Sequence, residues 1–244
     1  METKDEVLLS ATLLDSADIY VGKVELLDSM GSDFDVVNAA RVSFDVHHKN
    51  MEKRDVDLIK YLWNHKHSTP FEHCIMKFRI EVPMYIAKQH MRHRTWSYNE
   101  VSRRYTSSDL RVYTPVVFRA QAESNRQAST DETINPVVQS VDGEIAAYTK
   151  RASDEVKELN RRALKLYGNL IEAGICREQA RGVLPQNTFT SYIATANLLN
   201  VLKFLGLRNK PEAQYEMRLL AEAMEKMVSD RFPIVYSAYK GYLD

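Results

Sequence analysis

Short β-rich segments, separated by longer helical patterns, constrain this chain most strongly. Weak alternation of apolar and polar residues over 20–27 predicts one strand, and the β-rich stretches CIMKFRIEV, residues 74–82, and TFTSYIATA, residues 188–196, predict two more. The sequence has no internal repeat, no heptad register long enough for a coiled coil and no low-complexity tract. We therefore expect an α+β fold in a single domain over residues 1–244, with one modest sheet flanked by long helices.

Apolar residues at helical spacing account for much of the remaining chain. The clearest case is EKRDVDLIKYLWNH, residues 52–65, in which Val56, Ile59, Leu62 and Trp63 share one face. We expect helices, in chain order, over residues 34–41, 52–65, 83–93, 152–173, 177–184, 197–206 and 211–232. The helix over 152–173 also carries an apolar face, formed by Val156, Leu159, Ala163, Leu166, Tyr167 and Leu170.

Two segments lack this regularity. Residues 1–18 are mixed and acidic, and we expect a loosely attached N-terminal extension there. Residues 119–150 are polar, contain one aromatic residue, and include both Pro136 and Gly143. We expect this stretch to be a surface insertion that is partly mobile.

Charge and cysteine content exclude several classes of protein. The 33 Lys and Arg residues balance 33 Asp and Glu residues, so any anion site must be local rather than a property of the whole surface. No apolar run approaches the roughly 20 residues needed to span a bilayer, and the start lacks the pattern of a signal peptide. Cys74 and Cys176 show no disulfide or zinc spacing. We expect a cytoplasmic protein with reduced thiols.

The strongest candidate for chemistry is RHRTWSYNEVSRRY, residues 92–105. Its arginines alternate with small polar residues rather than with acids at helical spacing, and Trp96, Tyr98 and Tyr105 are unusual on a face that only meets solvent. Each guanidinium presents a rigid fork of donors that matches two oxygens of a phosphate or carboxylate. We therefore favour an anion site over a solvated basic face for Arg92, Arg94, Arg103 and Arg104.

Other chemistries remain open at this level. His65, His67 and His73, with Glu72 and Cys74 nearby, offer metal ligands, although HKHSTPFEH is not a known ligand spacing. Ser102 lies among cations but lacks the GxSxG elbow of a nucleophile, so a phosphate ligand is its more natural role. The sequence has neither GxxxxGK[ST] nor GxGxxG. A non-enzymatic nucleic-acid binder is disfavoured by the zero net charge.

The spacing of Arg92-His93-Arg94, seven residues and then Ser102 is the signature of one family. The blocks VELLDSMGSD, AARVSF, HKHSTPFEH, REQARGVLP and FLGLR accompany it in the order found in that family. The sequence resembles the flavin-dependent thymidylate synthases over roughly residues 20–118 and 150–240. The resemblance implies the fold of that family, with a mixed or antiparallel sheet, and a homotetramer with active sites at subunit interfaces.

The resemblance also implies a reaction. The family converts dUMP to dTMP with FAD, takes the carbon from 5,10-methylenetetrahydrofolate, reduces the flavin with NADPH, and uses neither a cysteine nucleophile nor a metal. Neither Cys74 nor Cys176 has the surroundings of a thiol enzyme, which agrees with that chemistry. Nucleic acid and membrane are not expected partners.

Residue roles follow only from the resemblance. It places dUMP against Gln89, Arg92, Glu100, Ser102, Arg103, Arg104, Arg181 and Arg208. Arg103 stands where the family usually has a small residue, so we expect its main chain to bind. Arg208 would face the uracil carbonyls and stabilise negative charge on the ring, with Arg181 assisting. We expect the catalytic set to be Arg208, Arg181, His67 and Ser102.

The implied FAD contacts come from three parts of the chain. They are Ser43, Thr69, Glu72, Arg92, His93, Arg94, Asn99, Asn197 and Lys203, and His67 would lie beside the flavin and the folate. The sequence departs from some relatives at two positions, where Leu199 replaces an arginine directed at the FAD phosphate and Glu212 replaces a histidine. We expect Lys203 to supply the missing cation.

Overall fold

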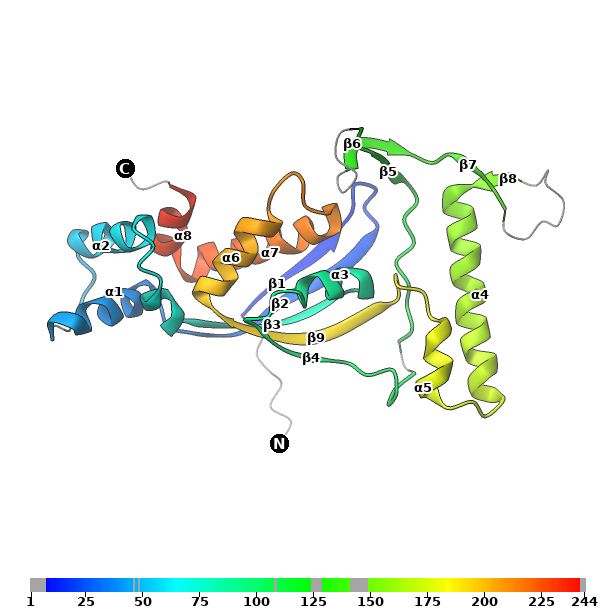
Figure 1. The fold of residues 1–244 in the computed structure, drawn as a ribbon, viewed down its shortest axis with the longest axis horizontal. Helices are drawn as coiled ribbons and strands as arrows, with labels where there is room; N and C mark the ends of the chain where they lie inside the picture. The colour runs from blue at the N-terminus through cyan, green and yellow to red at the C-terminus, as the bar shows by residue number, and fades with distance from the viewer. Residues whose placement is uncertain are drawn as a thin grey trace.

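An antiparallel sheet of five strands, in the order β1-β2-β3-β9-β4, forms the centre of the molecule (Figure 1). The computed structural model describes residues 8–45, 47, 49–107, 109–123, 129–140 and 149–241. The strands are β1 (Leu9–Leu14), β2 (Tyr20–Met30), β3 (Ile75–Pro83), β4 (Ser97–Glu100) and β9 (Phe189–Asn197). Each neighbouring pair is antiparallel, so the expected α+β fold with one modest main sheet is confirmed.

Helices cover one face of this sheet and gather at both of its ends (Figure 1). The α-helices are α1 (Asp33–Arg41), α2 (Lys53–Asn64), α3 (Met84–His90), α4 (Ala152–Glu172), α5 (Arg177–Ala180), α6 (Leu198–Arg208), α7 (Tyr215–Arg231) and α8 (Pro233–Lys240). Short 3-10 helices are η1 (Val42–Phe44), η2 (Thr69–His73) and η3 (Arg181–Val183). Within the residues that the structure describes, no helix is long and apolar enough to cross a membrane.

The core lies between the sheet and α3, α6 and α7. Alternate residues of β3 and β9 point into it, because successive side chains of a strand face opposite ways. These buried strand residues are Met76, Phe78, Ile80 and Val82 on β3, and Tyr192, Ala194 and Ala196 on β9. The side chains between them are only half-buried, so one face of the sheet carries most of the packing.

Helix boundaries agree with the sequence prediction except near the C-terminus. α6 continues through Gly206 to Arg208, where we expected it to end near the glycine. Gly206 is not among the glycines with positive φ, so it does not form the left-handed cap that would end the helix there. α7 begins at Tyr215, later than the predicted start at Pro211, and α8 was not predicted.

The expectation of a loose N-terminal extension over residues 1–18 is wrong for the part that the structure describes. β1 pairs with β2 along its length, and Leu13 is buried. Asp15 follows β1 and closes the turn, because its Oδ1 accepts hydrogen bonds from the backbone N–H groups of Ala17 and Ile19 at 2.9 and 3.0 Å. An edge strand with one half-buried face leaves only a weak pattern in a sequence. Residues 1–7 lie outside the described chain.

The expected surface insertion over 119–150 contains two small ribbons. β5 (Phe118–Gln121) pairs with β6 (Ser129–Ile134), and β7 (Val137–Gln139) pairs with β8 (Thr149–Arg151). Arg119 anchors the first ribbon on α7 through an ion pair with Glu216 at 3.7 Å. The insertion is therefore attached to the core rather than lying only on the surface. Residues 124–128 and 141–148 are outside the described part, so the expected mobility remains untested.

The apolar face predicted for α4 is buried only in part within this chain. Leu159 and Leu166 are 53% and 47% exposed, and the residues of α4 that are buried are Glu155, Asn160 and Tyr167. α4 lies with α5 at one end of the molecule, away from the layer formed by α6 and α7 (Figure 1). The periodic pattern identified the helix correctly, and on the face that it marks Tyr167 is buried whereas Leu159 and Leu166 are exposed.

Candidate functional site

The arginine-rich segment 92–105 leaves α3, turns, and joins the main sheet as β4. The turn is held by backbone hydrogen bonds, including His93 N–H to His90 O at 3.0 Å. β4 then pairs with β9, where Ser97 lies opposite Thr195 and Glu100 lies opposite Tyr192. Because β9 is an internal strand of the sheet, this pairing fixes the position of the whole segment along the sheet edge.

A buried aromatic cluster lies under the first part of the segment. His90 is fully buried and contacts the rings of Trp96, Tyr98, Tyr192 and Phe204. Its Nδ1 is 2.9 Å from the hydroxyl of Tyr192, whereas its Nε2 and the Nε1 of Trp96 have no hydrogen-bond partner among the described residues. Burial, reinforced by the charges of neighbouring groups, lowers the pKa of His90 to about 3. The imidazole is therefore neutral at physiological pH.

His93 and Arg208 meet on top of this cluster. Arg208 is the last residue of α6, and its Nε–H donates to Nε2 of His93 at 3.1 Å. His93 must therefore be neutral, with its own proton on Nδ1. Burial and the nearby guanidinium of Arg208 both lower the pKa of His93, which favours that neutral form. Burial and the charge of Arg92 lower the pKa of Arg208. Arg92, His93 and Arg208 thus form a compact cationic corner.

The second part of the segment is arranged differently. Glu100 accepts a hydrogen bond from Thr190 at 2.7 Å, and Ser102 Oγ accepts one from the backbone N–H of Arg104 at 3.3 Å. The guanidinium of Arg103 donates to the carbonyl oxygen of Phe189 at 3.1 Å. The side chain of Arg103 is therefore engaged with the strand, and the expected binding by its main chain stays a prediction.

An ion pair connects α5 to the second part of segment 92–105. Nη2 of Arg104 lies 3.3 Å from Oε2 of Glu178 on α5. Arg181 begins η3 directly after α5 and is exposed. The turn at residues 102–104 and the α5–η3 segment are thus neighbours, and both carry an exposed arginine that was predicted to bind dUMP.

Some of the residues predicted to hold FAD line two neighbouring cavities. Ser43, His67 and Thr69 line a cavity of ≈ 430 Å³ beside η2. Lys203 and Leu199 line another of ≈ 470 Å³, and the two cavities share Leu62, Lys66 and Ser68. Hydroxyls and the amino groups of Lys66 and Lys203 are suited to phosphate and ribose oxygens. The lining therefore fits part of a dinucleotide cofactor, and Lys203 faces the same cavity as Leu199.

The other predicted FAD residues do not line these cavities. Asn197 is the N-cap of α6, where its Oδ1 accepts from the backbone N–H of Asn200 at 3.0 Å. Glu72 on η2, Arg94 after α3 and Asn99 on β4 are exposed. Glu212, the second departure from relatives, is also exposed. A single chain therefore presents the predicted FAD residues on several surfaces rather than in one enclosed site.

The alternative chemistries gain no support. His65 stacks on Tyr61 at 4.1 Å between ring centroids, and its Nδ1 contacts the carbonyl oxygen of Tyr61 at 2.9 Å. Across the described ranges, no group of three His, Cys, Asp or Glu side chains is arranged to hold a metal ion. Burial raises the pKa of the Cys74 thiol to about 12, so this thiol stays protonated and unreactive.

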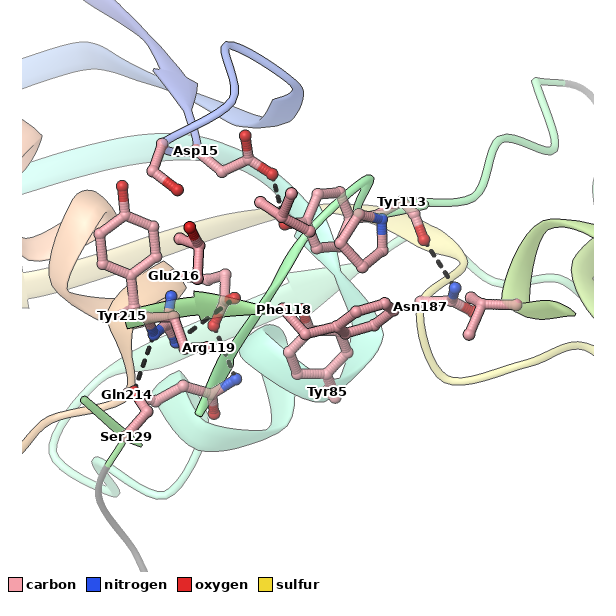
Figure 2. Close-up of a pocket in the computed structure, with 15 residues that line it drawn as sticks. Asp15, Tyr85, Tyr113, Phe118, Arg119, Ser129, Asn187, Gln214, Tyr215 and Glu216 are labelled. Atoms are coloured by element: carbon pink, nitrogen blue, oxygen red, sulfur yellow. Dashed lines mark hydrogen bonds and ion pairs between the residues drawn. The ribbon is translucent and has the colours of Figure 1, made fainter. Parts of the chain in front are cut away.

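One cavity was not predicted from the sequence. A space of ≈ 390 Å³ is lined by residues of the N-terminal strand region, α3, the first ribbon and the start of α7 (Figure 2). Its polar groups include Asp15, which accepts a hydrogen bond from Tyr113 at 2.7 Å, and the pair Arg119 and Glu216. These residues are distant in sequence and belong partly to the two segments that we expected to be peripheral. No local motif marks them.

Comparison with known proteins identifies the family of this chain. The family described as "Thymidylate synthase complementing protein" matches residues 25–234. The chain is 39% identical over 222 residues to the flavin-dependent thymidylate synthase of Thermus thermophilus, covering 91% of this chain and 77% of that protein. It is 34% identical over 221 residues to the enzyme of the same name from Thermotoga neapolitana, covering 91% and 92%.

The fold has a solved relative. The crystal structure of the UMP/dUMP methylase PolB from Streptomyces cacaoi, bound with 5-Br dUMP, superposes with a TM-score of 0.74 at 32% identity. The superposition covers 89% of this chain and 94% of that one. Sequence and fold agree over most of the chain, and the protein accordingly belongs to the family of flavin-dependent thymidylate synthases.

Proposed function

We propose that the protein converts dUMP to dTMP by reductive methylation, with 5,10-methylenetetrahydrofolate as carbon donor and NADPH-reduced FAD as hydride source. Membership of the family makes it a flavin-dependent methyltransferase of thymidylate synthesis. The observation that carries the residue-level proposal is the corner formed by Arg92, His93 and Arg208. It holds two guanidiniums close together around a neutral imidazole, which suits a ligand with both a phosphate and a polar ring.

The nucleotide is proposed to lie along segment 92–105. A nucleoside monophosphate is a dianion near neutral pH, and arginine forks with a serine hydroxyl match its oxygens. Arg104, Ser102 and the main chain of Arg103 are proposed for the phosphate end, with Arg181 from the neighbouring η3. The bound 5-Br dUMP of the Streptomyces cacaoi relative supports a nucleotide of this kind.

Arg208 is the proposed catalytic group. Its Nε is directed at His93, so the orientation of its planar guanidinium is set before any ligand arrives. Two remaining amino groups are available for the carbonyl oxygens of the uracil ring. A fixed cation at that position stabilises negative charge that develops on the ring during addition, without a covalent bond to the protein. Gln89 and Glu100 are proposed to orient the sugar and base.

FAD is proposed to occupy the two cavities beside η2, where a reduced flavin would supply the hydride. Ser43 and Thr69 are proposed for its polar groups, Lys203 for its phosphates, and His67 for stacking on flat rings. Glu72, Arg94, Asn99 and Asn197 are proposed to reach it from the surfaces that they occupy, with Arg92 and His93 at the junction with dUMP.

We propose that the protein assembles into a homotetramer, in which neighbouring chains cover apolar side chains that are exposed in the single chain. Leu159 and Leu166 expose the apolar face of α4, and Phe44 and Tyr105 are each 80% exposed beside the proposed ligand residues. Leu159 and Leu166 are seven residues apart on one helix and so share a face, and exposed apolar side chains that share a face mark association sites. A second chain laid over them would join the dispersed FAD residues into one pocket. We propose a cytoplasmic location, in keeping with free thiols at Cys74 and Cys176.

The test is the absorbance spectrum of the purified protein with and without dUMP, together with tritium release from 5-tritiated dUMP. We expect a yellow protein whose flavin spectrum changes when dUMP binds, and release that requires the folate and NADPH. A protein that stays colourless after incubation with FAD and releases no tritium would rule out the proposed function.

A further inference from the structure

A chain of polar contacts connects α3 with the ribbon β5–β6 by way of the first residues of α7. Nε2 of Gln89 donates to Oε1 of Gln214, and Nε2 of Gln214 donates to Oε2 of Glu216 at 3.0 Å. Oε1 of Glu216 lies 3.7 Å from Nη2 of Arg119. Figure 2 shows the last three of these side chains directed toward one another at the cavity wall. We call the four residues the amide relay.

The charged end of the relay is firmly held. The side chains of Arg119 and Glu216 are only 19% and 13% exposed. Arg119 also donates from Nε to the hydroxyl of Ser129 at 2.7 Å, and its guanidinium carbon lies 4.2 Å from the ring centroid of Tyr215. Because the carboxylate lies between this fixed cation and Gln214, it serves as a fixed acceptor at one end of the relay.

The chemistry of the relay permits only one orientation of its two amides. An ionised carboxylate accepts hydrogen bonds but cannot donate them. Gln214 must therefore present its NH₂ group to Glu216 and its carbonyl oxygen to Gln89. Gln89 must then donate one N–H to Gln214, and its own Oε1 and second N–H are directed elsewhere. Turning the amide of Gln214 over would place two oxygens against each other at Glu216 and two NH₂ groups against each other at Gln89, which is unfavourable away from bulk water.

We infer that Gln214 and Glu216 are positioning residues that hold the amide of Gln89 with its carbonyl oxygen toward the nucleotide. The relay fixes which group of the Gln89 amide faces Gln214, whereas the approach of a nucleotide to its carbonyl oxygen rests on the proposed function. A carbonyl oxygen recognises a hydrogen-bond donor, so the relay selects a nucleotide that presents a hydroxyl or a ring N–H at Gln89. No sequence motif links Glu216 to the nucleotide. Two residues, Gln214 and then Gln89, lie between Glu216 and the proposed ligand.

The orientation is testable without any ligand. Gln89→Glu places an acceptor against Oε1 of Gln214 and should lower the melting temperature. Adding Glu216→Gln lets Gln214 turn over, donate to the introduced carboxylate and accept from the introduced amide, so the double variant should recover most of the loss. Glu222→Gln is the matched control, because Glu222 lies exposed on the same helix and forms its ion pair with Arg218 at 3.6 Å, outside the relay. It should not restore stability.

A third substitution distinguishes rescue through the relay from rescue that comes only from removing the negative charge of Glu216. In a Gln214→Leu background the relay is broken, so Glu216→Gln should no longer rescue Gln89→Glu. Rescue that persists without Gln214, or a double variant whose loss is the sum of the single losses, overturns the inference.

The consequence for the nucleotide is tested by dUMP titration of the FAD-loaded protein. We expect Glu216→Gln to weaken dUMP binding about fivefold, the effect of one misoriented hydrogen bond, with Glu222→Gln unchanged. In a Gln89→Ala background, Glu216→Gln should have no further effect, and a persistent effect would contradict the relay. If the unmodified protein binds no dUMP, the proposed function fails, while the melting temperatures still decide the orientation of the relay.

Discussion

The two ends of segment 92–105, both assigned to the proposed nucleotide site, are held in place in different ways. At the first end, His93 and Arg208 rest on a cluster of buried rings and hold each other in place. At the second end, Ser102 and Arg104 lie in an exposed turn whose contacts are a backbone hydrogen bond and a surface ion pair. In the proposed function, the group assigned to the reacting ring is held in place before the ligand arrives, whereas the groups assigned to the phosphate lie in an exposed turn.

The preorganised end has a price in stability. His90 and Trp96 each bury a nitrogen that has no hydrogen-bond partner in the described chain. An unsatisfied buried polar group costs about 1–3 kcal/mol. The exposed end carries no such penalty, because water reaches its polar groups. The first end should therefore respond to substitution and pH more strongly than the second.

The largest effect is expected at Arg208. Arg208→Ala should lower turnover about 10²- to 10³-fold, since it removes a fixed cation directed at developing charge. FAD retention, measured from the flavin absorbance per subunit, should change little. Lys210→Ala removes a cation just beyond the same helix and serves as the control. A variant that loses flavin but turns over normally when FAD is returned would assign Arg208 to the cofactor instead.

The next effect concerns His90 and pH. Its pKa is about 3 in the folded chain and about 6.5 when unfolded, so the unfolded state binds an extra proton between these values. Stability should fall as pH drops from about 6.5 toward 3, with a slope of up to about 1.4 kcal/mol per pH unit. His90→Phe should reduce this slope in urea unfolding series, whereas Tyr192→Phe, which keeps the imidazole, should retain it. Equal slopes in His90→Phe and the unmodified protein would contradict the proposed cause.

A smaller effect is expected at the second end of the segment. Ser102→Ala should weaken dUMP binding about threefold to tenfold and leave measurable turnover, because it removes one hydrogen bond among several. Ser97→Ala on β4 provides a matched control with no expected change. Complete loss of turnover with normal dUMP affinity would instead favour a serine nucleophile.

The smallest effect is expected at the ion pair of Arg104 and Glu178, whose side chains are 50% and 63% exposed. Glu178→Gln should change the free energy of unfolding by less than about 0.5 kcal/mol, as is usual for exposed pairs. Chemical unfolding measures this directly. A change above about 2 kcal/mol, well beyond the range of exposed pairs, would mean that the second end is as tightly organised as the first.

Local patterns predicted the parts of the fold that depend on local signals. Periodicity located β2, β3 and β9 and the helices α1, α2 and α4 to within a few residues, because their core faces repeat along the chain. β4 was not predicted, since SYNE has no apolar alternation and becomes a strand only by pairing with β9. β1 was not predicted for a related reason, because it becomes a strand by pairing with β2 and has little apolar alternation of its own.

The candidate site also has features that the sequence predicted and features that it did not. The motif in segment 92–105 was visible, and so was the resemblance to a family. The contact of His93 with Arg208 was not, since the two residues are 115 positions apart. The amide relay was also invisible, because Gln89, Gln214 and Arg119 belong to separate elements and Arg119 lies in a stretch that we expected to be peripheral. Contacts of this kind arise from tertiary packing.

The pairing of β1 with β2 bears on how the protein behaves outside its native state. Residues 9–14 occupy the edge of β2 between Tyr20 and Leu26, and they cover apolar side chains there. Trimming the chain to residue 19, as its weak sequence pattern would invite, would leave a row of unpaired backbone groups beside exposed core residues. Such an edge recruits strands from other molecules. Residues 9–14, which look dispensable in the sequence, therefore protect the sheet edge from aggregation.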